Sequence, residues 1–231
     1  MRRQVLPDLK SQVILQELAK TNIDRETFKR MEHHVTTQQE IEQMIAHRHF
    51  ASAIASLSAL TDEEPADATW WSLLGQAYTE AGHQDSAIAA LMRAVLLDDE
   101  GPATCEALGV AWLRQGDLET AKTWFHRGLQ AVAPVGGAES PLRGSLLRNL
   151  AMAVMAEERP TAARFLLEEA AEASPRDLLT LHALSAQYLH TQRFDDAERL
   201  VERILEQPQL PRWIRESAEH RRELIAGQRA D

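Results

Sequence analysis

Apolar residues recur along this chain at intervals of three and four positions, a spacing that places them on one face of an α-helix. Leu74 and Tyr78 lie four residues apart. The same spacing returns in three later pairs: Leu108 and Trp112, Leu150 and Val154, and Leu184 and Tyr188. Such pairs are expected to bury together between two neighbouring helices. The pattern therefore predicts an all-α protein built from paired helices.

The apolar pattern repeats with a period of 34 residues. Leu74-Gly75 aligns with Leu108-Gly109, and Tyr78 aligns with Trp112. The register shifts once, by the eight residues of segment 136–143, and then resumes. A fixed period of this length is typical of stacked helical repeats. We predict five units, at residues 34–67, 68–101, 102–135, 144–177 and 178–211.

Two positions in each unit carry small residues, which predicts that two helices cross closely there. The eighth position holds Gly75, Gly109, Ala151 and Ser185 in the last four units. The twentieth position holds Ala53, Ala87, Ala121, Ala163 and Ala197. Gly82 and Gly116 fall where the first helix of a unit must stop and turn, and Glu158 and Gln192 replace them in later units. A glycine is therefore expected to help at this turn without being obligatory.

The second unit reproduces a run of residues found in a known repeat family: Trp71, Leu74, Gly75, Tyr78, Ala87, Leu91 and Ala94. Over residues 34–211 the chain resembles the tetratricopeptide repeat family, whose 34-residue unit is a helix–turn–helix. The resemblance implies a right-handed superhelical solenoid. It also implies that positions 2, 5, 6, 9, 12 and 13 of each first helix line an inner groove.

The ends of the chain depart from this unit. We expect an N-terminal helical arm over residues 1–33, with apolar stripes at Leu9, Val13, Ile14 and Leu18 and at Ile23, Phe28 and Met31. The run Thr37-Gln38-Gln39-Glu40 has the form of a capping box, which predicts that an atypical first repeat starts a helix there. The resulting organisation is an arm (1–33), three units (34–135), an insertion (136–143), two units (144–211) and a capping helix (212–231).

Pro211 is placed to start that final helix, which carries apolar residues on one face, namely Trp213, Ile214, Leu224 and Ile225. Charged residues on its other face would keep the open end of the stack solvated. The Gly136-Gly137 pair in the insertion is compatible with a kinked joint between two blocks of repeats or with an extended loop.

The implied groove positions give a candidate peptide-binding surface. Its residues are Leu73, Gln76, Ala103, Glu106, Ala107, Val110, Leu113, Arg148, Asn149, Met152, Met155, His182, Ala186 and Leu189. Apolar residues with adaptable methionines suit a peptide that brings a few hydrophobic anchors. Asn149 is placed to bond the ligand backbone, and Arg148 or Glu106 to set its direction. Repeats that capture the C-terminal carboxylate of chaperones place Lys, Asn and Arg at these positions, and only Arg148 with Asn149 approaches that pattern, so a carboxylate clamp is disfavoured. The alternative is a groove closed by the N-terminal arm or by a second copy of the chain.

Composition narrows the class of protein. The 35 acidic and 25 basic residues give a formal charge of -10, which disfavours nucleic acid as a partner. The single cysteine excludes an internal disulfide. Because no run of about 18 apolar residues occurs, we expect neither signal peptide nor membrane insertion, and a cytoplasmic location.

Catalytic and metal chemistry find little support in the sequence. No nucleophile, phosphate-binding or zinc-protease motif is present, so we expect neither an enzyme nor a cofactor. His33, His34, His47 and His49 cluster in sequence but have no cysteine or carboxylate at ligand spacing, which favours solvated surface histidines over a zinc site. Cys105 occupies an inter-helix position and is expected to pack rather than react.

Two functions remain open at this stage. The first is a chaperone or adaptor that holds a hydrophobic segment of a client protein, with possible dimerisation through the arm. In this respect the chain resembles the small repeat chaperones of bacterial type III secretion, although those usually have three units. The second is a static scaffold that bridges the components of a larger assembly by its outer faces.

Overall fold

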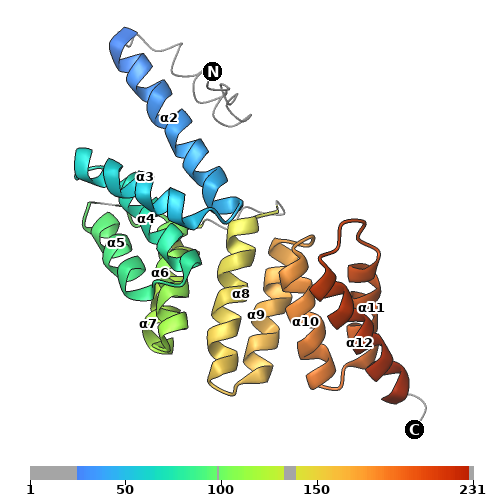
Figure 1. The fold of residues 1–231 in the computed structure, drawn as a ribbon. Helices are drawn as coiled ribbons and strands as arrows, with labels where there is room; N and C mark the ends of the chain where they lie inside the picture. Colours follow the sequence, from blue (N-terminus) through green and yellow to red (C-terminus); the bar gives the residue numbers. More distant parts are fainter. Residues whose placement is uncertain (1–24, 98, 133–138, 229–231) are drawn as a thin grey trace. The chain divides into compact units, whose positions relative to one another are not determined.

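The computed structural model describes residues 25–97, 99–132 and 139–228, in which helices are joined by turns and short linkers and no strand occurs (Figure 1). The helices are α2 (Arg25–Ala46), α3 (Phe50–Glu63), α4 (Ala68–Ala81), α5 (Gln84–Leu96), α6 (Pro102–Gln115), α7 (Leu118–Ala131), α8 (Pro141–Ala156), α9 (Pro160–Ala173), α10 (Leu178–His190), α11 (Phe194–Leu205) and α12 (Arg212–Gln228). The predicted all-α class is confirmed, and each expected unit contributes two consecutive helices.

The chain divides into two compact units at Asp99 and Glu100. Unit 1 contains α2 to α5, and unit 2 contains α6 to α12. Within unit 2, each helix from α6 to α12 packs against the next one along the chain (Figure 1). The division therefore falls between the second and third repeats.

The last residues of the insertion that we predicted at 136–143 are helical. Helix α8 begins at Pro141, because proline suits the first helical position and the Ser140 hydroxyl accepts a hydrogen bond from the Arg143 amide. The Gly136-Gly137 pair lies outside the described residues. Helices α7 and α8, on either side of the insertion, pack against each other.

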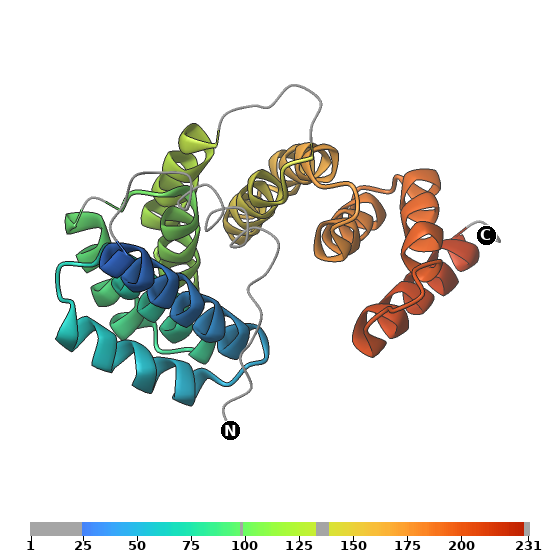
Figure 2. The ribbon, with the colours of Figure 1, turned by 90° about the horizontal axis from the view of Figure 1, so that it is seen from above.

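The expected boundary between the arm and the first repeat falls inside α2, so the capping-box interpretation is wrong. Helix α2 runs without a break from Arg25 to Ala46. The Thr37 hydroxyl donates to the His33 carbonyl at 2.8 Å, a contact of a residue in the middle of a helix rather than of a cap. Figure 2 shows α2 lying along α3, against which it packs. The expected arm stripe at Leu9, Val13, Ile14 and Leu18 lies outside the described residues.

The predicted close crossings are confirmed. The five alanines at the twentieth position are fully buried. A Cβ added to Gly75 would lie closer than 3.0 Å to the Leu91 side chain, and one added to Gly109 would lie equally close to the Phe125 ring. In the fourth repeat, the positions equivalent to Gly75 and Leu91 hold Ala151 and Leu167, which belong to one buried cluster. In each of these repeats a small residue therefore faces a large apolar side chain across a close helix crossing.

In all five repeats, the turn between the two helices contains a residue in the left-handed backbone conformation, with a positive φ. Gly82 and Gly116 have φ values of 86° and 93°. Arg48, Glu158 and Gln192 occupy the equivalent position with φ values of 63°, 59° and 58°. The prediction that glycine helps here without being obligatory is confirmed, although non-glycine residues adopt this conformation only at a cost of about 1–2 kcal/mol.

The last helix begins where the sequence predicted, immediately after Pro211. Ile214, Ala218 and Ile225 are buried against α10 and α11. The expected apolar face is only partly used, since Trp213 and Leu224 are exposed. Among the described residues, no helix combines the length and the apolar character needed to cross a membrane.

Candidate functional site

The first helices of the repeats in unit 2 form one continuous face. Helix α8 contacts α6, α10 contacts α8, and α12 contacts α10. We call the surface formed by α6, α8, α10 and α12 the A-face. It carries the candidate binding residues other than Leu73 and Gln76, which lie on α4 of unit 1.

The candidate residues differ in how far they are exposed to solvent. Ala103 and Met152 are exposed, whereas Leu73 and Ala107 are buried. The others are half-buried: Gln76, Glu106, Val110, Leu113, Arg148, Asn149, Met155, His182, Ala186 and Leu189. Leu73 shares a core cluster with Ile41, because α2 packs on α4 as the preceding repeat. Leu73 and Ala107 are therefore core residues and offer no binding surface.

The polar candidates at the centre of the A-face are engaged within the chain. The Asn149 side-chain amide donates to the Glu106 carboxylate at 2.8 Å, which joins α8 to α6. The Arg148 guanidinium forms an ion pair with Asp177, and Asp177 also caps the first turn of α10 through the Leu179 and Thr180 amides. These groups would have to give up internal partners in order to bind a ligand.

The apolar candidates of the A-face are only partly covered. Val110 and Leu113 pack against the cluster around Phe125, and Met155 receives a weak hydrogen bond from the Gln187 amide at 3.4 Å. Met152 keeps 44% of its surface exposed and Leu179 keeps 43%. These two residues lie on neighbouring first helices, α8 and α10.

The A-face continues onto α12, which the sequence analysis assigned as a capping helix and not as part of the binding surface. The His182 ring lies 3.1 Å from the Ser217 hydroxyl and 3.0 Å from a terminal nitrogen of Arg221. The Trp213 ring and the His182 ring meet in an edge-to-face arrangement, with the ring centroids 5.3 Å apart. Carrying the 34-residue count past position 211 would have found Trp213, because it takes the second position of a sixth unit, as Leu179 does in the fifth.

Burial and the neighbouring charge of Arg221 lower the pKa of His182 to about 4. Because a guanidinium only donates hydrogen bonds, the His182 Nε2 that faces it must be unprotonated. His182 is therefore a neutral acceptor near neutral pH. This half-buried histidine is a structural part of the α10–α12 contact.

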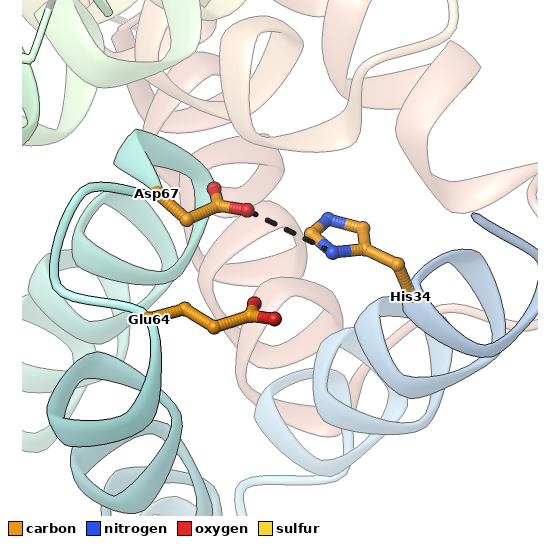
Figure 3. A group of neighbouring side chains, drawn as sticks. All are labelled: His34, Glu64 and Asp67. Atoms are coloured by element: carbon orange, nitrogen blue, oxygen red, sulfur yellow. Dashed lines mark ion pairs between the residues drawn. The ribbon is translucent and has the colours of Figure 1, made fainter. Parts of the chain in front are cut away.

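A second cluster lies in unit 1, where three potential metal ligands come together (Figure 3). One ligand atom from each of His34, Glu64 and Asp67 lies within 4.8 Å of the others. They border a hollow of about 500 Å³ between α2 and the turn that joins α3 to α4. Such side chains are ligands that zinc uses in proteins. The sequence analysis missed the carboxylates because the fold brings them from about 30 residues away.

Contacts within the chain account for this cluster without a metal. Glu64 accepts a hydrogen bond from the Trp70 indole at 2.8 Å, and Asp67 caps α4 by accepting from the Thr69 amide. His34 lies 3.7 Å from Asp67 and stacks on Trp70 with ring centroids 4.2 Å apart. Through these contacts the cluster joins α2 to the α3–α4 turn. His34 is therefore not the solvated surface residue that we expected. His33, His47 and His49 are exposed.

Comparison with known proteins addresses the fold. Tetratricopeptide repeat family models match residues 45–103 and 154–215, which together make up more than half of the chain. No curated protein sequence matches it. The solved structure of TTC0263, a tetratricopeptide repeat protein of Thermus thermophilus, is 16% identical, with 79% of this chain and 95% of that one covered and a TM-score of 0.66.

Two further structures show the same fold. PilF of Pseudomonas aeruginosa is 13% identical, with 71% of this chain and 72% of that one covered and a TM-score of 0.62. YrrB, a repeat protein with an unusual peptide-binding site, is 19% identical, with 66% and 74% covered and a TM-score of 0.51. The family matches fall in both units and agree with the helix pairs, the buried alanines and the left-handed turns. The chain belongs to the tetratricopeptide repeat family.

Proposed function

We propose that the chain is a non-catalytic protein-binding module, and that the A-face of unit 2 holds a segment of a partner protein through hydrophobic anchors. The observation that carries this proposal is the exposure of Met152 and Leu179 on adjacent first helices. Unbranched methionine side chains adapt to differently shaped anchors, which suits a surface that receives a flexible client. We further propose that the role is that of a chaperone or adaptor in the cytoplasm.

The internal pairing of the polar groups supports recognition by apolar contacts. Arg148 and Asn149, which the sequence analysis placed against the ligand, already have carboxylate partners in Asp177 and Glu106. Breaking a half-buried ion pair in order to form another gives little net free energy. The apolar area of Met152, Leu179 and the half-buried Val110, Leu113 and Leu189 is the part of the surface that gains by leaving water.

A client-holding assay tests this role. The reduced insulin B chain is an apolar model client, and its aggregation is followed by light scattering with and without the protein. Met152→Glu and Leu179→Glu should each abolish the protection, because a charge would have to be buried under the client. Phe165→Glu is the matched control, since Phe165 is 59% exposed but lies on α9, a second helix of its repeat. Equal protection by all three variants would rule out the A-face as the holding surface.

A specific observation favours the second candidate function, a scaffold that binds through its second helices. The Phe165 ring borders a hollow of about 360 Å³ with Arg159, Pro160, Thr161 and Ala162, and Arg164 lies over the ring at 4.4 Å from its centroid. Exposed aromatic residues beside a hollow are common anchors in protein interfaces. Under this alternative, Phe165→Glu releases co-purifying folded partners, while Met152→Glu retains them.

A further inference from the structure

The α12 end of the A-face contains an arginine whose charge has no partner of opposite sign among the described residues. Arg221 takes the tenth position of the sixth unit, where earlier repeats place fully buried alanines at Ala77, Ala111 and Ala153. Its guanidinium donates to the His182 carbonyl at 3.1 Å and to the Ser185 hydroxyl at 2.9 Å. Its other contact is with the neutral His182 ring. Within the part of the chain that the structure describes, Arg221 thus contacts uncharged groups.

Other half-buried arginines of unit 2 differ from Arg221 in this respect. Arg148 forms an ion pair with Asp177, and Arg164 forms one with Glu168 at 2.6 Å. A cation withdrawn from water without a counter-charge is destabilised. Burial accordingly lowers the pKa of Arg221 from its usual value. A carboxylate placed against this guanidinium would therefore bring more free energy here than at either of the paired arginines.

The surroundings of Arg221 supply the remaining features of a binding site. Trp213, Ser217, Arg221 and Leu224 follow one another along one stripe of α12, at intervals of four, four and three residues. Trp213 is 54% exposed, and Leu224 is also exposed. At about 1.5 Å per residue, Trp213 lies about 12 Å before Arg221 and Leu224 about 4–5 Å after it. Apolar surface thus flanks the cation on both sides.

We propose that Arg221 binds the side-chain carboxylate of an Asp or Glu in a partner segment, whose flanking apolar residues pack on Trp213 and Leu224. This inference rests on the proposed function, because it places the site on the same A-face. Surface on both sides of the cation requires a ligand chain that continues past the carboxylate, which favours an internal acidic residue over a chain terminus. The net charge of -10 disfavours a run of acidic residues, so one carboxylate within an apolar segment fits best.

Two blocked thirteen-residue peptides test the inference by fluorescence anisotropy. Both carry Leu-Phe pairs on either side of the central residue, which is Glu in one peptide and Gln in the other. The wild-type protein should bind the Glu peptide about tenfold more tightly, the range expected for one charge-assisted contact. Arg221→Gln should remove this preference and leave the affinity for the Gln peptide unchanged. Arg222→Gln, which removes the same charge from an exposed neighbour, should preserve it.

A second variant keeps the test decisive if Arg221→Gln disturbs the α10–α12 contact. Trp213→Ala removes an exposed side chain, and it should weaken both peptides several-fold while the Glu preference persists. Equal binding of the two peptides by the wild type, or no binding of either, would overturn the inference. So would preferential binding of a Gln peptide with a free C-terminus, which would indicate a chain-end carboxylate. The insulin B chain assay decides the A-face proposal separately, since it depends on Met152 and Leu179.

Discussion

Gly109→Ala tests the close packing of the helix crossings most directly. Gly109 lies on α6, and an added methyl group would come within 3.0 Å of three atoms of the Phe125 ring. The Phe125 side chain is fully buried in a cluster with Leu146 and Leu150, so the ring cannot move away freely. Overpacking of such a site costs about 3 kcal/mol, while replacing glycine by alanine within a helix returns about 1 kcal/mol. We expect a net loss of about 2 kcal/mol in the free energy of unfolding.

Urea unfolding followed by circular dichroism measures this loss. Gly227→Ala is the matched control, because the added methyl group meets no atom within 4 Å and should be neutral or slightly stabilising. Combining Gly109→Ala with Phe125→Leu recreates the pair that Ala151 and Leu167 form in another repeat. The double variant should therefore be more stable than the sum of the two single changes predicts, by about 1–2 kcal/mol. A fully stable Gly109→Ala protein, or strictly additive changes, would refute the reasoning.

Three further outcomes are expected. Asp177→Ala removes both the cap of α10 and the ion-pair partner of Arg148, and it should lower the free energy of unfolding in urea titrations by about 2–4 kcal/mol. A loss below about 1 kcal/mol would contradict the combined role of Asp177 as cap and ion-pair partner. Gln192→Gly relieves a positive φ and should raise the free energy of unfolding by about 0.5–1 kcal/mol, which thermal unfolding would detect as a higher midpoint. An unchanged midpoint would argue against backbone strain at Gln192. Burial and, to a smaller extent, the charge of Arg221 lower the pKa of His182 from 6.5 to about 4. Because the unfolded chain binds the proton more readily than the folded one, the free energy of unfolding should decline as the pH falls from 6.5 toward 4. Allowing for solvent screening, the decline is about 1–2 kcal/mol, and His182→Gln should remove that part of the wild-type pH profile; parallel profiles would exclude it.

The repeat architecture was predictable because its signals are local and recur. The alanine at Ala87 reappears in every repeat, and the positions of Gly75 and Leu91 keep a small and a large apolar residue in most of them. A small residue at such a position indicates a close helix crossing. The start of the first repeat was not predictable in the same way. The Thr37 capping-box pattern is as acceptable inside a long helix as at its beginning, since a threonine hydroxyl can bond back to the carbonyl four residues earlier. Only the packing of α2 on α3 and α4 decides between the two.

The sequence predicted on which helices the candidate residues lie, but not which of their side chains already have partners within the chain. The periodic count placed Met152 and Arg148 on a first helix of a repeat, here α8, yet it could not show that Asp177 would pair with Arg148 or that Glu106 would pair with Asn149. Those partners lie 29 and 43 residues away, and they approach only when neighbouring repeats stack. The contribution of α12 was missed for a different reason: the count ended with the fifth unit, although the sequence continues it.

The internal pairing of Arg148 and Asn149 has a consequence for how strongly the A-face can bind. Both side chains are already restrained by their carboxylate partners, so their rotamer freedom is lost when the protein folds and not when a ligand arrives. Ordering such a side chain at an interface would otherwise cost about 0.5–1.5 kcal/mol. The central part of the A-face is therefore preorganised. Under the proposed function, a short client segment would bind there with less entropic penalty than an open polar surface would impose.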